Sequence, residues 1–446
     1  MSGKLQRMGT LPRLWSQISK RPLVRDTIVT TVLSTAGKAA GFLIPFFIAA
    51  WFGVTGETDA FFFAYGVIIF LAMIFSPVIE IVIVPFIVEG RMHDKDIGKF
   101  VGGILVISAL GLIILSAVFL VSIKPVLSVF AKFSEVELNL IHKILLEATP
   151  LLILLVWTSI LAGTLNAYKV FAIPALSPAF RALATLFFIF LFKDKIGVHA
   201  IAWGYVVGEL WRFLILFLLL KRLNLFCLTF SIRLEHKLTE FLRTSSYLII
   251  GMSIIGLSGI INRIMASWLG QGNVSLIEYA ERLYMIPTNL LSGGLIVTIL
   301  SHWCERYYEF GKEKLDHDVS KTAIAVGSMG LLFTIIFFLA RNDLVELAYG
   351  HGKFTFKQIE KVKIIFTFYL LGLTPYLLSY VYERAFLTRK ETKVLLYGNV
   401  LRIMGTVLCN WIFMRFIEVS GIALSTSLVA LLYAGLLRLL FNKKCA

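Results

Sequence analysis

Charged side chains inside stretches apolar enough to cross a bilayer are the residues of this sequence that could do chemistry. Lys38 lies in TVLSTAGKAAGFLIPFFIAAWFG (residues 31–53), where it is the only charge. A charge at the centre of a membrane span costs about 2.5–3.5 kcal/mol, so its side chain should meet a partner or a watery cavity rather than lipid. Lys38 lies roughly 15 Å inside its predicted helix at about 1.5 Å per residue, near the limit that snorkelling can bridge. We therefore expect Lys38 to face a cavity.

Eight further charges lie within predicted spans or at their ends: Arg212, Arg263, Arg282 and Arg402, with Asp59, Glu80, Glu209 and Glu281. Arg402 and Glu80 are deep and have no obvious local partner, which favours a cavity for both. Glu209 and Arg212 are three residues apart on one predicted helix, so a pair between them is the simpler interpretation.

Arg263 and Arg282 leave alternatives open. Each lies five residues from the end of its predicted span, so each could reach the membrane interface by snorkelling. Glu278 precedes Arg282 by four residues, and an ion pair on one helix face would also satisfy that arginine. The third interpretation is that both arginines bind an anionic substrate.

The intramembrane cations outnumber the anions and come from both halves of the chain. A cavity lined by lysine and arginine would suit a phosphate or diphosphate, because guanidinium groups bind such oxygens in a fork geometry. The sequence has no phosphate-cradling loop and no nucleophile–base pair, so we expect binding and translocation rather than catalysis. It also indicates no cofactor and no metal site, because the four cysteines lack metal-ligand spacing.

The composition indicates an all-α polytopic membrane protein. Of 446 residues, 58% are hydrophobic and 16% charged, and the mean hydropathy is +0.84. The net charge of +16 lies in short loops between apolar blocks and not on a basic face with aromatic platforms, so a nucleic-acid partner is not expected. Apolar runs predict about twelve spans, at 28–52, 60–88, 100–122, 144–165, 173–192, 198–220, 244–268, 277–301, 322–340, 362–383, 394–414 and 419–440.

The distribution of polar segments predicts the domain organisation. Residues 1–27 form a basic N-terminus without a cleavable signal peptide, because the apolar run that follows is too long for one. The polar segment 222–243 separates two six-helix lobes, 28–221 and 244–446. AAWFG (49–53) and ASWLG (266–270) end the first helix of each lobe, which supports an internal repeat. Lysine and arginine are concentrated in the termini and the even-numbered loops, which places both termini in the cytoplasm.

Five motifs in matching order resemble the MurJ/MviN family of lipid II flippases, in the multidrug/oligosaccharidyl-lipid/polysaccharide exporter superfamily. They are TDAFFFAY (58–65), VPFIVEG (84–90), GTLNAYKVFAIPALSP (163–178), NRIMASWLGQGNVSLIEYAERLYMIP (262–287) and YGHGKFT (349–355). The resemblance implies two six-helix lobes around a V-shaped central cavity that opens alternately to each face. The implied partners are an undecaprenyl-diphosphate-linked saccharide and membrane lipid, and a coupling ion or the membrane potential would drive transport in the bacterial inner membrane.

The resemblance carries over three site residues and also shows departures. Lys38 stands where the family has an arginine, Asp59 matches the aspartate of its TDAFF motif, and Arg282 matches the arginine of its YA-acid-RL motif. At two further positions where the family has arginine, this sequence has Ile44 and Ala72. The twelve predicted spans do not include two C-terminal helices that members of the family often have.

The expected function is translocation of lipid II from the cytoplasmic to the outer leaflet. Because two cavity cations are replaced, a flippase for another polyprenyl-linked glycan, such as O-antigen, capsule or exopolysaccharide, is the alternative. An ion-coupled small-molecule antiporter and a non-transporting scaffold are weaker alternatives. The candidate substrate-binding residues are Lys38, Asp59, Glu80, Arg263, Arg282 and Arg402.

Overall fold

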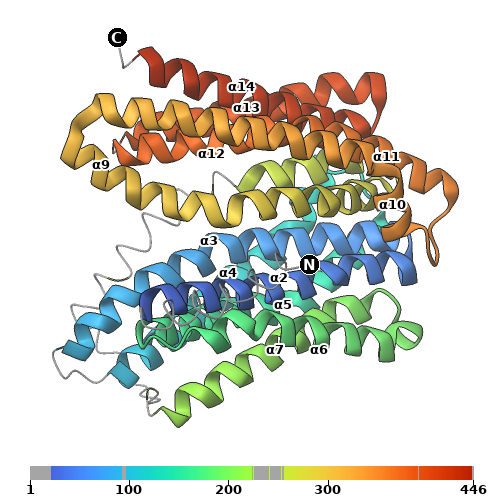
Figure 1. Cartoon of the computed structure of the whole chain (residues 1–446). Coiled ribbons are helices and arrows are strands. Elements are labelled where there is room, and N and C mark those ends of the chain that lie inside the picture. The colour runs from blue at the N-terminus through green and yellow to red at the C-terminus, as the bar shows by residue number, and fades with distance from the viewer. Residues whose placement is uncertain are drawn as a thin grey trace, which may run out of the picture. The chain divides into compact units, whose positions relative to one another are not determined.

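The computed structural model describes residues 22–92, 97–223, 225, 241, 253, 256–389 and 391–443, and within these ranges it is helical without strands (Figure 1). A helical segment at 256–267 precedes α9. The remaining helices are α2 (Pro22–Phe52), α3 (Gly56–Met92), α4 (Ile97–Phe130), α5 (Glu135–Ala167), α6 (Ala172–Ile196), α7 (His199–Arg222), α9 (Asn273–Leu339), α10 (Arg341–Tyr349), α11 (Phe356–Leu371), α12 (Leu373–Thr388), α13 (Thr392–Ile417) and α14 (Ser420–Lys443).

Ten segments of the described helices are long and apolar enough to cross a membrane. They confirm the predicted all-helical, multi-span fold class. Of the two other predicted spans, 244–268 begins outside the described residues, and 277–301 lies within α9 but is not among the ten segments, so the count of twelve stays a prediction. The predicted span 362–383 is extended to Phe356–Thr388 and contains both α11 and α12.

The chain forms two compact units, each assembled from separate segments. The first comprises Met1–Ile44, Phe75–Ser116 and Ala148–Leu248, and the second comprises Pro45–Ile74, Ala117–Glu147 and Ile249–Ala446. The division into lobes at 28–221 and 244–446 stays a prediction. The predicted basic N-terminus and the linker 222–243 lie mostly outside the described residues.

In the first unit, α6 and α7 form a helical hairpin (Figure 1). Gly197 ends α6 with a φ of 57°, a left-handed conformation that glycine adopts without a steric penalty. Gly204 on α7 faces Ile189 and the carbonyl of Thr185 at distances too short for an added Cβ. This close approach packs the two helices along much of their length.

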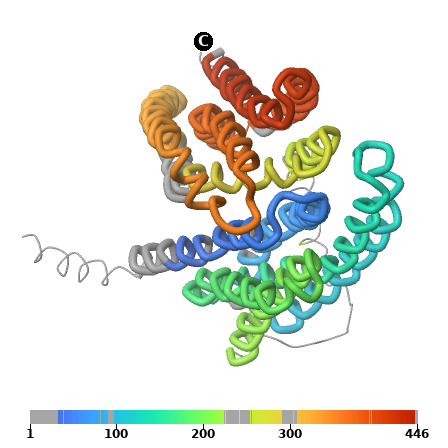
Figure 2. Tube along the Cα trace, turned by 90° about the vertical axis from the view of Figure 1, so that its right-hand side faces the viewer, coloured from blue at the N-terminus to red at the C-terminus, as the bar shows by residue number. Residues whose placement is uncertain are grey.

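In the second unit, α9 and α11–α14 pack as neighbours, and α13 and α14 form an adjacent pair (Figure 2). α9 is interrupted at Gly311, whose φ of 79° and ψ of −170° are not helical, so two helices meet there. α11 and α12 meet at Gly372, where an added Cβ would lie 2.6 Å from the Ser427 hydroxyl of α14. Ser427 donates to the carbonyl of Phe368 at 2.6 Å, which ties α14 to this break.

The two fragments that suggested an internal repeat both end in a glycine with a positive φ. Gly53 closes AAWFG with a φ of 71°, and Gly270 closes ASWLG with a φ of 93°. A left-handed glycine directly after a helix satisfies the last carbonyls and stops the helix. Gly53 directly follows α2, whereas two turn residues separate Gly270 from the helical segment 256–267, so the short sequence match extends to the positive φ but not to the helix end.

Candidate functional site

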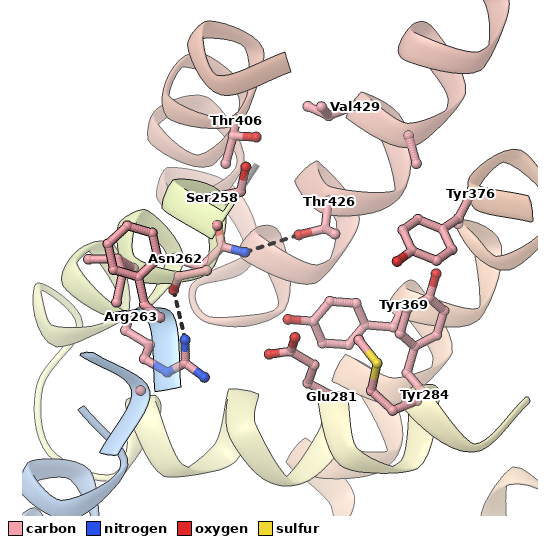
Figure 3. A pocket seen from close by; sticks show the side chains of 18 of the residues that line it. Ser258, Asn262, Arg263, Glu281, Tyr284, Tyr369, Tyr376, Thr406, Thr426 and Val429 are labelled. Atoms are coloured by element: carbon pink, nitrogen blue, oxygen red, sulfur yellow. Dashed lines mark hydrogen bonds between the residues drawn. The ribbon is translucent and has the colours of Figure 1, made fainter. Parts of the chain in front are cut away.

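A pocket of about 470 Å³ in the second unit gathers four of the intramembrane charges named above, together with Glu278 (Figure 3). Its lining comes from α3, residues 256–263, α9, α11, α12, α13 and α14. The charged residues that line it are Arg263, Glu278, Glu281, Arg282 and Arg402. Its volume is within the range of about 300–1,000 Å³ that is typical of ligand pockets.

One buried carboxylate holds two of the arginines. Glu278 is 3% exposed and accepts from Arg263 Nη2 at 2.6 Å and from Arg282 Nη2. Arg263 also donates to the carbonyl of Gly259 at 3.1 Å. Because each carboxylate oxygen receives a different guanidinium, Glu278 fixes both arginines while neutralising only one of their charges.

Gly66 of α3 makes room for this cluster. A Cβ built on Gly66 would lie 2.6 Å from Nε of Arg263, closer than real Cβ contacts come. Glycine at this position therefore permits the guanidinium of Arg263 to pass close to the backbone of α3. The arrangement also shows that Arg263 is enclosed by protein and does not extend toward the end of its helix.

Arg402 lies on the same pocket without an ion pair among the described residues. Its guanidinium lies over the Tyr433 ring, 5.7 Å from the ring centroid, and the Tyr433 hydroxyl donates to Glu383 at 3.1 Å. Arg402 lines this pocket, and its predicted contact with substrate stays a prediction. The pocket lining thus carries three arginines and two glutamates.

Asp59 lies at the start of α9 and outside the pocket lining. We expected it to contact substrate, and that contact stays a prediction. Its side chain is 2% exposed and is not part of the pocket lining. It accepts from the backbone N–H of Gly272 at 2.5 Å, the N–H of Ser275 at 2.7 Å and the Ser275 hydroxyl at 2.5 Å. Asp59 therefore caps the N-terminus of α9, where a carboxylate satisfies free N–H groups and favours the helix dipole.

The two candidate residues of the first unit, Lys38 and Glu80, are not in the pocket lining. Lys38 lies in α2, but its side chain is outside the described residues, so its contacts stay a prediction. Glu80 is half-buried in α3 and accepts from the Asn166 amide of α5 at 3.5 Å. That partner is 86 residues away in sequence, which is why local spacing did not indicate it.

The predicted pair of Glu209 and Arg212 is confirmed, and the structure adds a second arginine. Glu209 is fully buried and accepts from Arg212 at 3.0 Å, from Arg181 of α6 at 3.3 Å and from the Thr158 hydroxyl at 2.6 Å. The sequence analysis missed Arg181, although a basic residue in the predicted span 173–192 was a visible signal. This cluster holds α5, α6 and α7 together.

Comparison with known proteins identifies the family. The family model described as "Lipid II flippase MurJ" matches residues 48–446. The chain belongs to this family. A protein named "Probable lipid II flippase MurJ" from Buchnera aphidicola subsp. Acyrthosiphon pisum (strain APS) is 27% identical over 421 residues, which are 92% of this chain and 81% of that protein.

Solved structures show the fold that the MurJ family shares with other transporters. A structure of "Lipid II flippase MurJ, inward closed conformation" has a TM-score of 0.78 at 22% identity, covering 94% of this chain and 87% of that one. An inward-facing multidrug resistance MATE family transporter of the MOP superfamily has a TM-score of 0.75 at 14% identity, covering 94% and 97%. The predicted family is confirmed, these solved structures share the fold, and the chain is a multi-span member of a flippase family.

Against this MurJ family background, the pocket contains residues that sequence reasoning did not select. Four tyrosines line it, Tyr284, Tyr369, Tyr376 and Tyr380, together with Asn262 and Thr426. In Figure 3 the labelled tyrosines lie on one side, Arg263 and Asn262 lie on the other, and Glu281 lies between them. The sequence did show tyrosines in two predicted spans, but periodicity alone cannot distinguish a tyrosine that lines a pocket from one that packs in the core.

Proposed function

We propose that this protein is a flippase that moves lipid II from the cytoplasmic to the outer leaflet of the bacterial inner membrane by alternating access. Membership of the MurJ family over residues 48–446 carries the proposal. The pocket supports it, because three arginines converge there from three different segments of the second unit. Lipid II carries its saccharide on a diphosphate, the kind of group that guanidinium forks bind.

Arg263 and Arg282 are the residues that we expect to bind the diphosphate. Glu278 orients both guanidinium groups, and ordering them before substrate arrives lowers the entropic cost of binding. Arg402 supplies a third positive charge on the same pocket. Lys38 and Glu80 are proposed as further contacts from the sequence, whereas Asp59 is expected to act through α9.

A flippase for a different polyprenyl-linked glycan is the second candidate, and one observation favours it. Ile44 is 1% exposed and Ala72 is 4% exposed, and the family resemblance expects arginines at both positions. Two apolar buried side chains at these positions reduce the positive charge available to the substrate. A glycan with fewer charged groups than the peptide-bearing saccharide of lipid II would tolerate that loss.

Complementation tests the proposal. Cells depleted of their own lipid II flippase should survive when they express this protein, and should die when they express Arg282→Ala at equal membrane abundance. Arg282→Lys should restore growth only in part, because an ammonium group lacks the guanidinium fork. Arg341→Ala is the matched control, because Arg341 lies on α10 outside the pocket lining and contacts Phe338.

One result would contradict the site assignment, and another would contradict the substrate. Survival with Arg282→Ala would remove that arginine from the substrate site. Failure of the unmodified protein to support growth, with rescue of cells that lack a flippase for another lipid-linked glycan, would support the second candidate instead.

A further inference from the structure

Four tyrosines form a continuous aromatic wall in the pocket, and we call Tyr284, Tyr369, Tyr376 and Tyr380 the tyrosine wall. The rings of Tyr284 and Tyr369 are stacked, with centroids 5.5 Å apart and planes at 23°. Tyr376 lies 6.3 Å from Tyr284 and 5.0 Å from Tyr380. Because the residues come from α9, α11 and α12, the wall is assembled by packing and not by one helix.

The hydroxyl groups of the tyrosine wall have hydrogen-bonding capacity that the described residues do not use. The Tyr369 hydroxyl is buried and has no partner among the described residues, although its side chain lines the pocket. The Tyr376 and Tyr380 hydroxyls share one hydrogen bond of 2.9 Å, which leaves further donor and acceptor positions. Buried polar groups are normally satisfied, so an unpaired hydroxyl on a pocket indicates a site for a polar ligand.

Ring faces and hydroxyl groups together suit a sugar. A pyranose ring has an apolar C–H face and a rim of hydroxyls, so it can stack on tyrosine while its rim exchanges hydrogen bonds with phenol groups. Glu281 and Arg402 border the wall and can accept from and donate to the same rim. A polyprenyl tail would leave these hydroxyls unpaired, and a diphosphate is better matched by the arginines held at Glu278.

We propose that the tyrosine wall is the saccharide subsite of the pocket and determines specificity for the sugar adjacent to the diphosphate. The inference rests on the proposed function, because it assigns one part of the lipid-linked substrate to one part of the same pocket. The diphosphate binds at Arg263 and Arg282, and the sugar stacks beyond Glu281 on Tyr376 and Tyr380, the two half-buried members of the tyrosine wall. The tyrosine wall therefore gives a substrate that carries a sugar a higher affinity than the same lipid diphosphate without one.

The test measures binding of two ligands to the purified protein in detergent. Lipid II carries the saccharide, and undecaprenyl diphosphate has the same lipid and diphosphate without it. The wild type should bind lipid II more tightly, and Tyr376→Phe with Tyr380→Phe should reduce lipid II affinity by roughly five- to tenfold, as expected for one or two lost hydrogen bonds. Affinity for undecaprenyl diphosphate should not change.

Tyr382→Phe is the matched control. Tyr382 lies on α12 like Tyr376 and Tyr380 but is not part of the pocket lining, so removing its hydroxyl should leave both affinities unchanged. All of these variants keep the aromatic ring, and equal thermal unfolding midpoints would show that they keep the fold. Tyr376→Leu, which also removes a stacking surface, should weaken lipid II binding further than Tyr376→Phe.

The possible outcomes separate the two proposals. Wild-type binding of lipid II with unchanged affinity in the double phenylalanine variant would overturn the subsite and leave the proposed function intact. Equal weakening for both ligands would also overturn it, because the wall would then act on the diphosphate or on the fold. A wild type that does not bind lipid II would overturn the proposed function, and the subsite with it.

Discussion

Glu278 is the residue on which the charge arrangement of the pocket depends. Its carboxylate is 3% exposed and pairs with Arg263 and Arg282, whose side chains are 15% and 31% exposed. Glu278→Ala would leave both guanidinium groups without this partner, and breaking a buried ion pair from one side costs roughly 3–5 kcal/mol. We expect a lower thermal unfolding midpoint in detergent and a lower membrane abundance.

Two further variants give this prediction a control. Adding Arg263→Ala to Glu278→Ala should recover part of the lost stability, because one uncompensated charge is removed. Glu135→Ala should change stability by no more than about 1 kcal/mol, because Glu135 is 79% exposed and lies 3.8 Å from Lys124. An unfolding midpoint for Glu278→Ala equal to that of the wild type would contradict a structural role for this pair.

At the scale of elements, glycines determine how closely helices approach. A Cβ on Gly37 of α2 would lie 2.8 Å from the Ala175 carbonyl oxygen and 3.4 Å from Pro178 of α6. Gly37→Ala should therefore force the helices apart and reduce the free energy of unfolding by about 1–3 kcal/mol. Thermal unfolding of the purified variant measures this loss.

The same substitution in α4 provides the opposite expectation. Gly103 has no atom within 4 Å of an added Cβ. Gly103→Ala should therefore stabilise the protein by about 0.5–1 kcal/mol, because alanine loses less conformational entropy than glycine in a helix. A similar decrease in stability for both variants would show that the effect comes from glycine replacement in general and not from the contact between α2 and α6.

For the whole molecule, the charge distribution of the loops predicts that both termini face the cytoplasm. A reporter that is active only outside the cytoplasm should stay silent when fused after Ala446. The same reporter should be active when fused after Lys195, in a predicted outer loop. Activity after Ala446 would indicate an odd number of spans and would contradict the twelve-helix interpretation.

Properties that depend on neighbouring residues were determined by the sequence. A run of about 20 apolar residues is itself the physical requirement for crossing a bilayer, so the spans and the fold class could be predicted without coordinates. The pairs Glu209–Arg212 and Glu278–Arg282 were also predictable, because residues three or four apart lie on one helix face. The family could also be predicted, because its motifs occur along this chain in the same order as in the family.

Only the tertiary structure decided which distant side chains meet. Arg263 pairs with Glu278 across 15 residues, and Asp59 binds Ser275 across 216. The sequence showed that Asp59 was an unusual charge near a membrane span, but the use of its carboxylate depends on where α9 begins in space. The tyrosine wall is similar, because a tyrosine in an apolar span has the same periodicity whether it packs in the core or lines a pocket. Local pattern determines which segments form helices, whereas the chemistry of a site depends on contacts between segments that hydropathy and spacing do not encode.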